Sequence, residues 1–99
     1  MKWLDLDMIK DQLRIEHDDT TDDKLLTRYG NAAEETVLNL CNTTTEQLVE
    51  KYGEVPMPLI QGALMLVDVS YQYRSPVSDR NFSAVPYTFD LLIKPYMIL

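Results

Sequence analysis

The sequence predicts a small all-α domain, a bundle of four to five helices with a long loop before the C-terminal helix. Three observations lead to this fold class. Several segments repeat apolar residues at spacings of three and four, few segments alternate apolar and polar residues, and 99 residues suffice for one modest core. The composition, with 45% hydrophobic and 25% charged residues, is that of an ordinary globular domain. We therefore expect a single domain over residues 1–99.

The first helix is predicted to be short. Asp5 can cap its N-terminus, and the apolar spacing ends near Arg14 or Ile15. A polar, aspartate-rich run follows, in which Thr20 or Thr21 is the expected N-cap of the next helix. The aspartates of this run lie where the positive end of that helix dipole favours them.

The second helix is the most clearly indicated element and is predicted over residues 22–41. Asn42 and Thr43 are expected to end it. A short helix should then begin at Thr45, without a full capping box, and stop at Gly53. The second helix has one apolar stripe at helical spacing, formed by Leu25, Leu26, Tyr29, Ala32, Ala33, Thr36, Val37 and Leu40.

The fourth helix is predicted over residues 59–73, with Pro58 in its first turn. It is apolar around nearly its whole circumference, so it should lie at the centre of the bundle. Residues 74–86 contain two prolines and no regular period, which indicates a long loop. A last short helix is expected over residues 87–93, and Pro95 should end it.

Charge and composition exclude several classes of function. The net charge of −7 opposes tight binding to phosphates, so nonspecific nucleic-acid binding is not expected. No apolar run is long enough to span a membrane, and the acidic start lacks the features of a secretory signal. The single cysteine, Cys41, cannot form an internal disulfide. Together these features predict a protein of the cytoplasm.

Catalytic and metal-binding patterns are weak. His17 lies between two acidic residues, but no second histidine or cysteine partner completes a transition-metal site, so a solvated or capping role is favoured. The acidic run does not match a calcium loop, because Asp23 stands where the turn needs glycine and Tyr29 where it needs glutamate. The three glycines are too far apart for a phosphate loop. We therefore expect no enzyme activity, no cofactor and no metal.

Three segments together resemble the small head-tail connector, or adaptor, proteins of long-tailed double-stranded DNA phages. They are WLDLDMIKDQLRIEHDDTTDDKLL, VPMPLIQGALMLVDVSYQYR and SAVPYTFDLLIKPY, and their order and spacing cover essentially the whole chain. The resemblance implies a structural protein of the virion neck, encoded by a phage or prophage and present in the host cytoplasm before assembly. It implies a ring of about twelve copies below the portal. It also implies contacts with the portal and the next neck or tail-completion protein, and a channel through which DNA passes without specific binding.

The C-terminal region supplies the candidate interface. Nine of the last thirteen residues are apolar or aromatic, more than a short one-sided helix on a small monomer can bury. Residues 96–99 are expected to project as an extended tail that docks on a neighbour, although they could instead fold back on the domain's own core. Residues 75–86 are expected to become ordered in the assembly. The candidate interface residues are Arg80, Phe82, Val85, Tyr87, Phe89, Tyr96, Met97 and Leu99.

Two other classes of function stay open from the residues alone. The acidic chain could be a small regulator or inhibitor that binds a basic protein surface. It could also be a metal-assisted enzyme, if carboxylates converge on His17.

Overall fold

The computed structural model describes residues 1–72 and 87–98, and it confirms the all-α class. The predicted loop over residues 74–86 lies outside this part of the chain. Within the described residues there are five α-helices, one 3-10 turn and no strand: α1 (Leu6–Leu13), α2 (Asp23–Cys41), α3 (Thr45–Tyr52), α4 (Met57–Gln72), α5 (Tyr87–Ile93) and the turn η1 (Lys94–Tyr96). These bounds agree closely with the predicted second, third and fifth helices.

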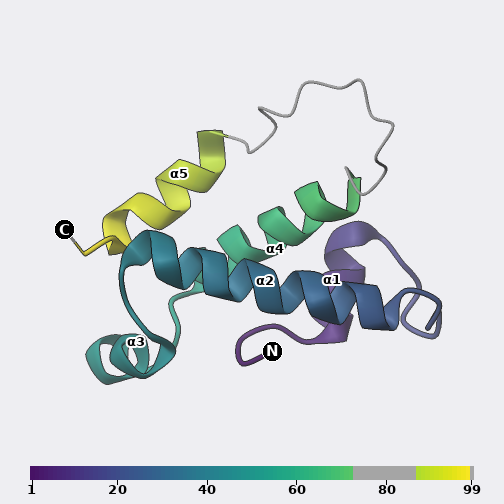
Figure 1. Cartoon of the computed structure of the whole chain (residues 1–99), viewed down its shortest axis with the longest axis horizontal. Helices are drawn as coiled ribbons and strands as arrows, with labels where there is room; N and C mark the ends of the chain where they lie inside the picture. Colours follow the sequence, from purple (N-terminus) through teal and green to yellow (C-terminus); the bar gives the residue numbers. More distant parts are fainter. Residues whose placement is uncertain (73–86, 99) are drawn as a thin grey trace.

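Helix α4 lies at the centre, as its apolar circumference predicts. It packs against α1, α2 and α5, and Figure 1 shows it behind the long α2 with α1 and α5 at opposite ends. Leu59, Ala63 and Val67 of α4 are fully buried. Gly62 lies beneath α5, where an added Cβ would approach the Cδ1 atom of Ile93 to 2.7 Å, so the missing side chain permits close packing of the two helices.

The core is formed by one continuous cluster of apolar side chains from all five helices and the N-terminal segment. The stripe predicted for α2 is broader than the face that the structure buries, because α4 covers a narrower part of that helix. Ala32, Thr36 and Leu40 are exposed, with 44% of Leu40 accessible. The buried core residues are Leu4, Ile9, Leu26, Ala33, Val37, Cys41, Leu48, Leu59, Ala63, Leu64, Val67, Phe89 and Ile93.

Two predicted N-caps need correction. The N-cap of α2 is Asp22 rather than Thr20 or Thr21, because the preceding residues form a tight turn in which the Asp19 carboxylate accepts the Thr21 N–H at 3.0 Å. Helix α3 begins at Thr45 as predicted, but Thr44 is its N-cap. Gln47 is therefore at the third helical position, and a full capping box forms where none was predicted.

The N-terminal strap, defined as residues 1–4, is held by a buried glutamate of α2. The backbone N–H groups of Lys2, Trp3 and Leu4 each donate to the Glu34 carboxylate at 2.9 Å, and Glu34 is only 6% exposed. The Trp3 indole N–H also donates to the Thr45 hydroxyl of α3 at 3.0 Å. A buried carboxylate needs such donors, and the strap supplies three of them.

The C-terminal tail, defined as residues 96–98, folds back over its own chain, so the prediction of a projecting tail is wrong. The Ile98 N–H donates to the Cys41 carbonyl at 2.9 Å. Cys41 is the last residue of α2, and its carbonyl therefore has no partner within the helix. The turn at Pro95 redirects the chain toward this free acceptor, and Figure 1 shows the C-terminus beside the end of α2.

Candidate interaction surface

The structure places half of the predicted interface residues within the part that it describes. Phe89 is 4% exposed and belongs to the core of the single chain, while Tyr96 and Met97 are half-buried against that core. Tyr87 begins α5. Four residues lie outside the described residues, namely Arg80, Phe82, Val85 and Leu99. The assignment of these eight residues to an interface stays a prediction.

A pocket of about 210 Å³ lies between the tail and α3, and we call it the tail seat. The C-terminal end of α2 and the capped start of α3 form one wall, and the tail forms the other. The Thr43 hydroxyl donates to the Gln47 side-chain oxygen at 3.0 Å, which fixes the wall at the start of α3. The lining residues are Asn42, Thr43, Gln47, Leu48, Lys51, Tyr52, Tyr96 and Ile98.

An aromatic pair joins the two walls of the tail seat. The rings of Tyr52 and Tyr96 meet edge to face, with centroids 5.6 Å apart and planes at 74°. The Lys51 ammonium lies 5.3 Å from the centre of the Tyr52 ring. The ring pair and the ammonium each add a weak attraction to the free energy gained by burying apolar area.

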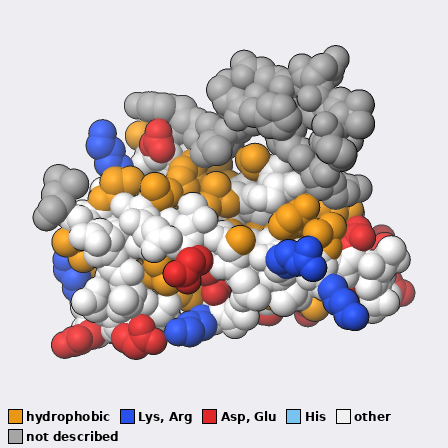
Figure 2. All heavy atoms as spheres, viewed as in Figure 1, with side chains coloured by type: hydrophobic (Ala, Val, Ile, Leu, Met, Phe, Trp, Pro, Cys, Tyr) orange, Lys and Arg blue, Asp and Glu red, His pale blue; other side chains and the backbone are white. Residues whose placement is uncertain are grey.

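Exposed apolar side chains surround this end of the molecule. Leu40 on α2, Tyr52 on α3 and Ile98 in the tail are 44%, 42% and 48% exposed, and they belong to the three elements that meet at the tail seat. Figure 2 shows hydrophobic side chains gathered over α5 and the C-terminal end of α2. Leu40 and Tyr52 were not identified as surface residues from the sequence. For Tyr52 the signal was the shortness of α3: this helix buries one apolar side chain, Leu48, and its other apolar side chains remain exposed.

A second hollow follows the face of α4 that is open between α1 and α5. It measures about 540 Å³, and it is lined by side chains from all three helices: Gln12, Gln61, Met65, Asp68, Val69, Thr88 and Leu92. Within residues 1–72 and 87–98, much of the apolar circumference predicted for α4 is covered, and this face is partly accessible.

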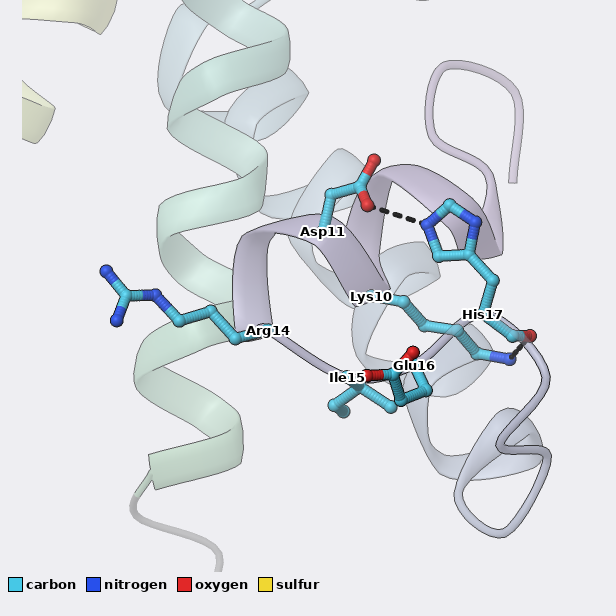
Figure 3. Close-up of a pocket in the computed structure, with 6 residues that line it drawn as sticks. All are labelled: Lys10, Asp11, Arg14, Ile15, Glu16 and His17. Carbon is cyan, nitrogen blue, oxygen red and sulfur yellow. Dashed lines mark hydrogen bonds and ion pairs between the residues drawn. The ribbon is translucent and has the colours of Figure 1, made fainter.

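The opposite end of the molecule carries nearly all of the net charge. Eight of the sixteen acidic side chains and only two basic ones lie within residues 5–23, so this stretch supplies six of the seven net negative charges. One of the two cations, Lys10, is 3% exposed; its ammonium lies 2.8 Å from the Asp23 carboxylate and donates to the His17 carbonyl at 3.1 Å. The other, Arg14, points away from the imidazole (Figure 3).

His17 lies at the surface of this acidic end. Its Nε2 is 2.6 Å from an Asp11 carboxylate oxygen, and the hydrogen bond to Asp11, followed by the charge of Asp11, raises the pKa of His17 above 6.5. Figure 3 shows the imidazole turned toward Asp11. Among the described residues no group of three or more His, Cys, Asp or Glu side chains could hold a metal ion. Burial raises the pKa of the Cys41 thiol, which leaves it protonated and poorly nucleophilic at neutral pH.

Comparison with known proteins gives one match. A family model described as phage gp6-like head-tail connector protein matches residues 4–97, which include the last residue of the strap, all five helices and the first two residues of the tail. Searches of curated proteins and of solved structures gave no significant match. No helix within residues 1–72 and 87–98 is long and apolar enough to cross a membrane.

Proposed function

The chain belongs to the phage gp6-like head-tail connector family, whose members are structural proteins of the virion neck, and from this premise we propose that it assembles into a ring. Copies of the chain form a closed ring of about twelve below the portal. The observation that carries the proposal is the family match across residues 4–97. The protein acts as a structural adaptor and catalyses no reaction.

The surface of the single chain is consistent with self-association. Apolar side chains at the tail seat remain exposed, and the open face of α4 offers a further apolar hollow. A cyclic ring requires two different surfaces on each copy that fit one another, because each subunit contacts one neighbour on each side. The tail seat and the α4 face are two separate surfaces that could each contact a neighbouring copy. The interface predicted from the sequence adds residues of the C-terminal region to them.

The charge distribution suits a DNA conduit. A net charge of −7 per copy, most of it within residues 5–23, repels phosphates wherever those residues face the channel. A channel lined in this way lets DNA pass without retaining it. The portal on one side and the next neck or tail-completion protein on the other would contact the two rims of the ring.

The test combines mass measurement with reconstitution. The purified chain is studied by light scattering over a wide concentration range, alone and with its cognate portal, and the particles are imaged by electron microscopy. We expect closed rings at high concentration or on the portal. Failure to form an oligomer or to bind the portal at any ionic strength would refute the proposal.

The acidic end favours one alternative function, a small regulator or inhibitor that binds a basic protein surface. Most of the negative charge of the chain lies within residues 5–23. A surface that binds a cationic partner needs such a concentration of negative charge. Such a protein would stay a monomer or dimer at high concentration, and its binding would weaken steeply with added salt. The mass measurement and a salt series therefore separate the two functions.

A further inference from the structure

The C-terminal tail is held in its own seat by two specific contacts, in addition to the partial burial of Tyr96 and Met97 against the core. One backbone hydrogen bond, from the Ile98 N–H to the Cys41 carbonyl, ties its end to α2. One edge-to-face contact, between Tyr96 and Tyr52, ties its start to α3. Half of the Ile98 side chain remains accessible to solvent at 48%. A segment held in this way opens at low cost compared with the helices beneath it.

The seat is also incompletely filled. With the tail in place, a pocket of about 210 Å³ remains between the tail and α3. This pocket is partly open to solvent and has polar as well as apolar lining residues, so the tail covers its seat without filling it.

A hinge separates the tail from the folded core. Ile93, the last residue of α5, is fully buried and packs against Gly62 of α4, so α5 is firmly anchored. Lys94 and Pro95 follow in an exposed 3-10 turn. A change of backbone angles in this turn redirects the tail without disturbing α5. Short connections of this kind are where chains exchange segments.

We propose that, in the assembly, the tail of one copy leaves its own seat and docks in the tail seat of the adjacent copy. This inference rests on the proposed ring and names the contact that links neighbouring subunits. A second copy is the occupant because the seat already fits this tail: the free Cys41 carbonyl meets the Ile98 N–H, and Tyr52 meets Tyr96. Exchange re-forms these contacts between chains, and head-to-tail repetition of the exchange closes a ring.

Cross-linking of two cysteine variants tests the exchange. A chain with Tyr52→Cys is mixed with a size-tagged chain with Tyr96→Cys, unfolded and refolded together, concentrated until the wild type self-associates, and oxidised. The exchange predicts a disulfide between the two chains about tenfold more abundant than in a control mixture of Tyr52→Cys and Leu91→Cys chains. Leu91 is a matched control because it is 57% exposed on α5, outside the tail. Buried Cys41 is present in every chain.

A variant with both Tyr52→Cys and Tyr96→Cys calibrates the reporter, since in dilute solution it should close the disulfide within one chain. If the mixed single variants cross-link no more than the control while the wild type still forms oligomers, the tail stays on its own chain and this inference is wrong, whereas the proposed ring stands. If the wild type forms no oligomer alone or with the portal, both fail.

Deletion of residues 96–99 gives a second, independent test. The exchange predicts a variant that keeps the helical content of the wild type and loses its oligomers. An oligomer of wild-type size would overturn the exchange, because the tail would then be dispensable. Loss of the fold would also overturn it, since the tail would then belong to the core of each subunit.

Discussion

The two ends of the chain both contact α2 and α3, but they are bound by different means. The N-terminal strap is bound through a buried ionisable group, the Glu34 carboxylate, which accepts three backbone N–H groups at 2.9 Å. The C-terminal tail is bound through one neutral backbone hydrogen bond, from Ile98 to Cys41, one aromatic contact, and the partial burial of Tyr96 and Met97. Hydrogen bonds to a charged acceptor are roughly twice as strong as neutral ones.

This difference indicates which end can move. Release of the strap would leave a buried carboxylate without donors, which is costly. Release of the tail leaves one carbonyl at a helix end, where water can replace the lost donor. We therefore expect the strap to stay closed in the free and assembled protein, and the tail to be the end that exchanges partners.

The largest expected effect is the loss of the strap's acceptor. Glu34→Ala should lower the free energy of unfolding by about 3 kcal/mol, because three N–H donors lose their partner and part of the strap detaches. Urea denaturation followed by circular dichroism measures the change. Glu35→Ala is the matched control, an exposed neighbour on the same helix, and should change stability by less than about 0.5 kcal/mol. Equal effects of the two substitutions would contradict the assigned role of Glu34.

Substitution of two glycines compares the packing of α5 at Gly62 with the packing of the strap at Gly30. Gly62→Ala should cost about 2 kcal/mol, because the new Cβ would lie 2.7 Å from the fully buried Ile93 and α5 cannot move away without loss of packing. At Gly30 the added Cβ would overlap the Met1 sulfur, the far end of a flexible and partly exposed side chain. Gly30→Ala also gains helix propensity, so its net effect should stay within about 1 kcal/mol. Thermal unfolding of the two variants ranks them, and a reversed order would show that α5 is the looser element.

A double-mutant cycle measures how firmly the tail is held within one chain. Tyr52→Ala, Tyr96→Ala and the double variant should give a coupling energy of about 0.5 to 1 kcal/mol, the usual range for an edge-to-face pair. The measurement is made at a dilution at which light scattering gives the mass of a single chain, so that only contacts within one chain contribute. A coupling energy above about 2 kcal/mol would show that the tail is bound as tightly as the strap, and it would contradict the inference that the tail is the end that moves.

The smallest expected effect on stability is that of the exposed carboxylate Asp11, which we compare with the buried carboxylate Glu34. Asp11 raises the pKa of His17, so the pair stabilises the folded state below the unfolded pKa of about 6.5 and the contribution is lost as the pH rises through the folded pKa. NMR titration should show a His17 pKa above 6.5 in the wild type and a lower value in Asp11→Asn. Because both side chains are exposed, global stability should barely depend on pH in this window. An unchanged His17 pKa in the variant would exclude the contact in solution.

Local features of the fold were predictable from short stretches of sequence. The cap at Asp5, the end of α2 at Asn42, the stop at Gly53 and the central position of α4 all follow from residues within one or two turns of each other. Two of the errors were local too. They concerned which residue caps a helix, Asp22 and Thr44, where several neighbouring residues can serve and the surrounding turn selects one.

The candidate site was only partly predictable. The apolar excess after residue 86 indicated that the C-terminal region takes part in contacts, and the direction of the tail was predicted wrongly. Its destination depends on Cys41 and Tyr52, which precede it by more than 40 residues in the sequence. No periodicity or capping rule links residues so far apart. Only the folded structure shows that Tyr52 lines the tail seat, because its contact there is with Tyr96 of the tail.

By itself the sequence determined the helical class, the order of the helices, the excess of negative charge near the N-terminus and, through three motifs in series, the connector family. These properties depend on residue type and on short spacings, which the chain carries before it folds. Only the tertiary structure decided that Glu34 binds the strap and that the tail returns to α2. Both contacts pair groups distant in sequence, and each forms because packing of the helices brings an unpaired backbone donor to an available acceptor.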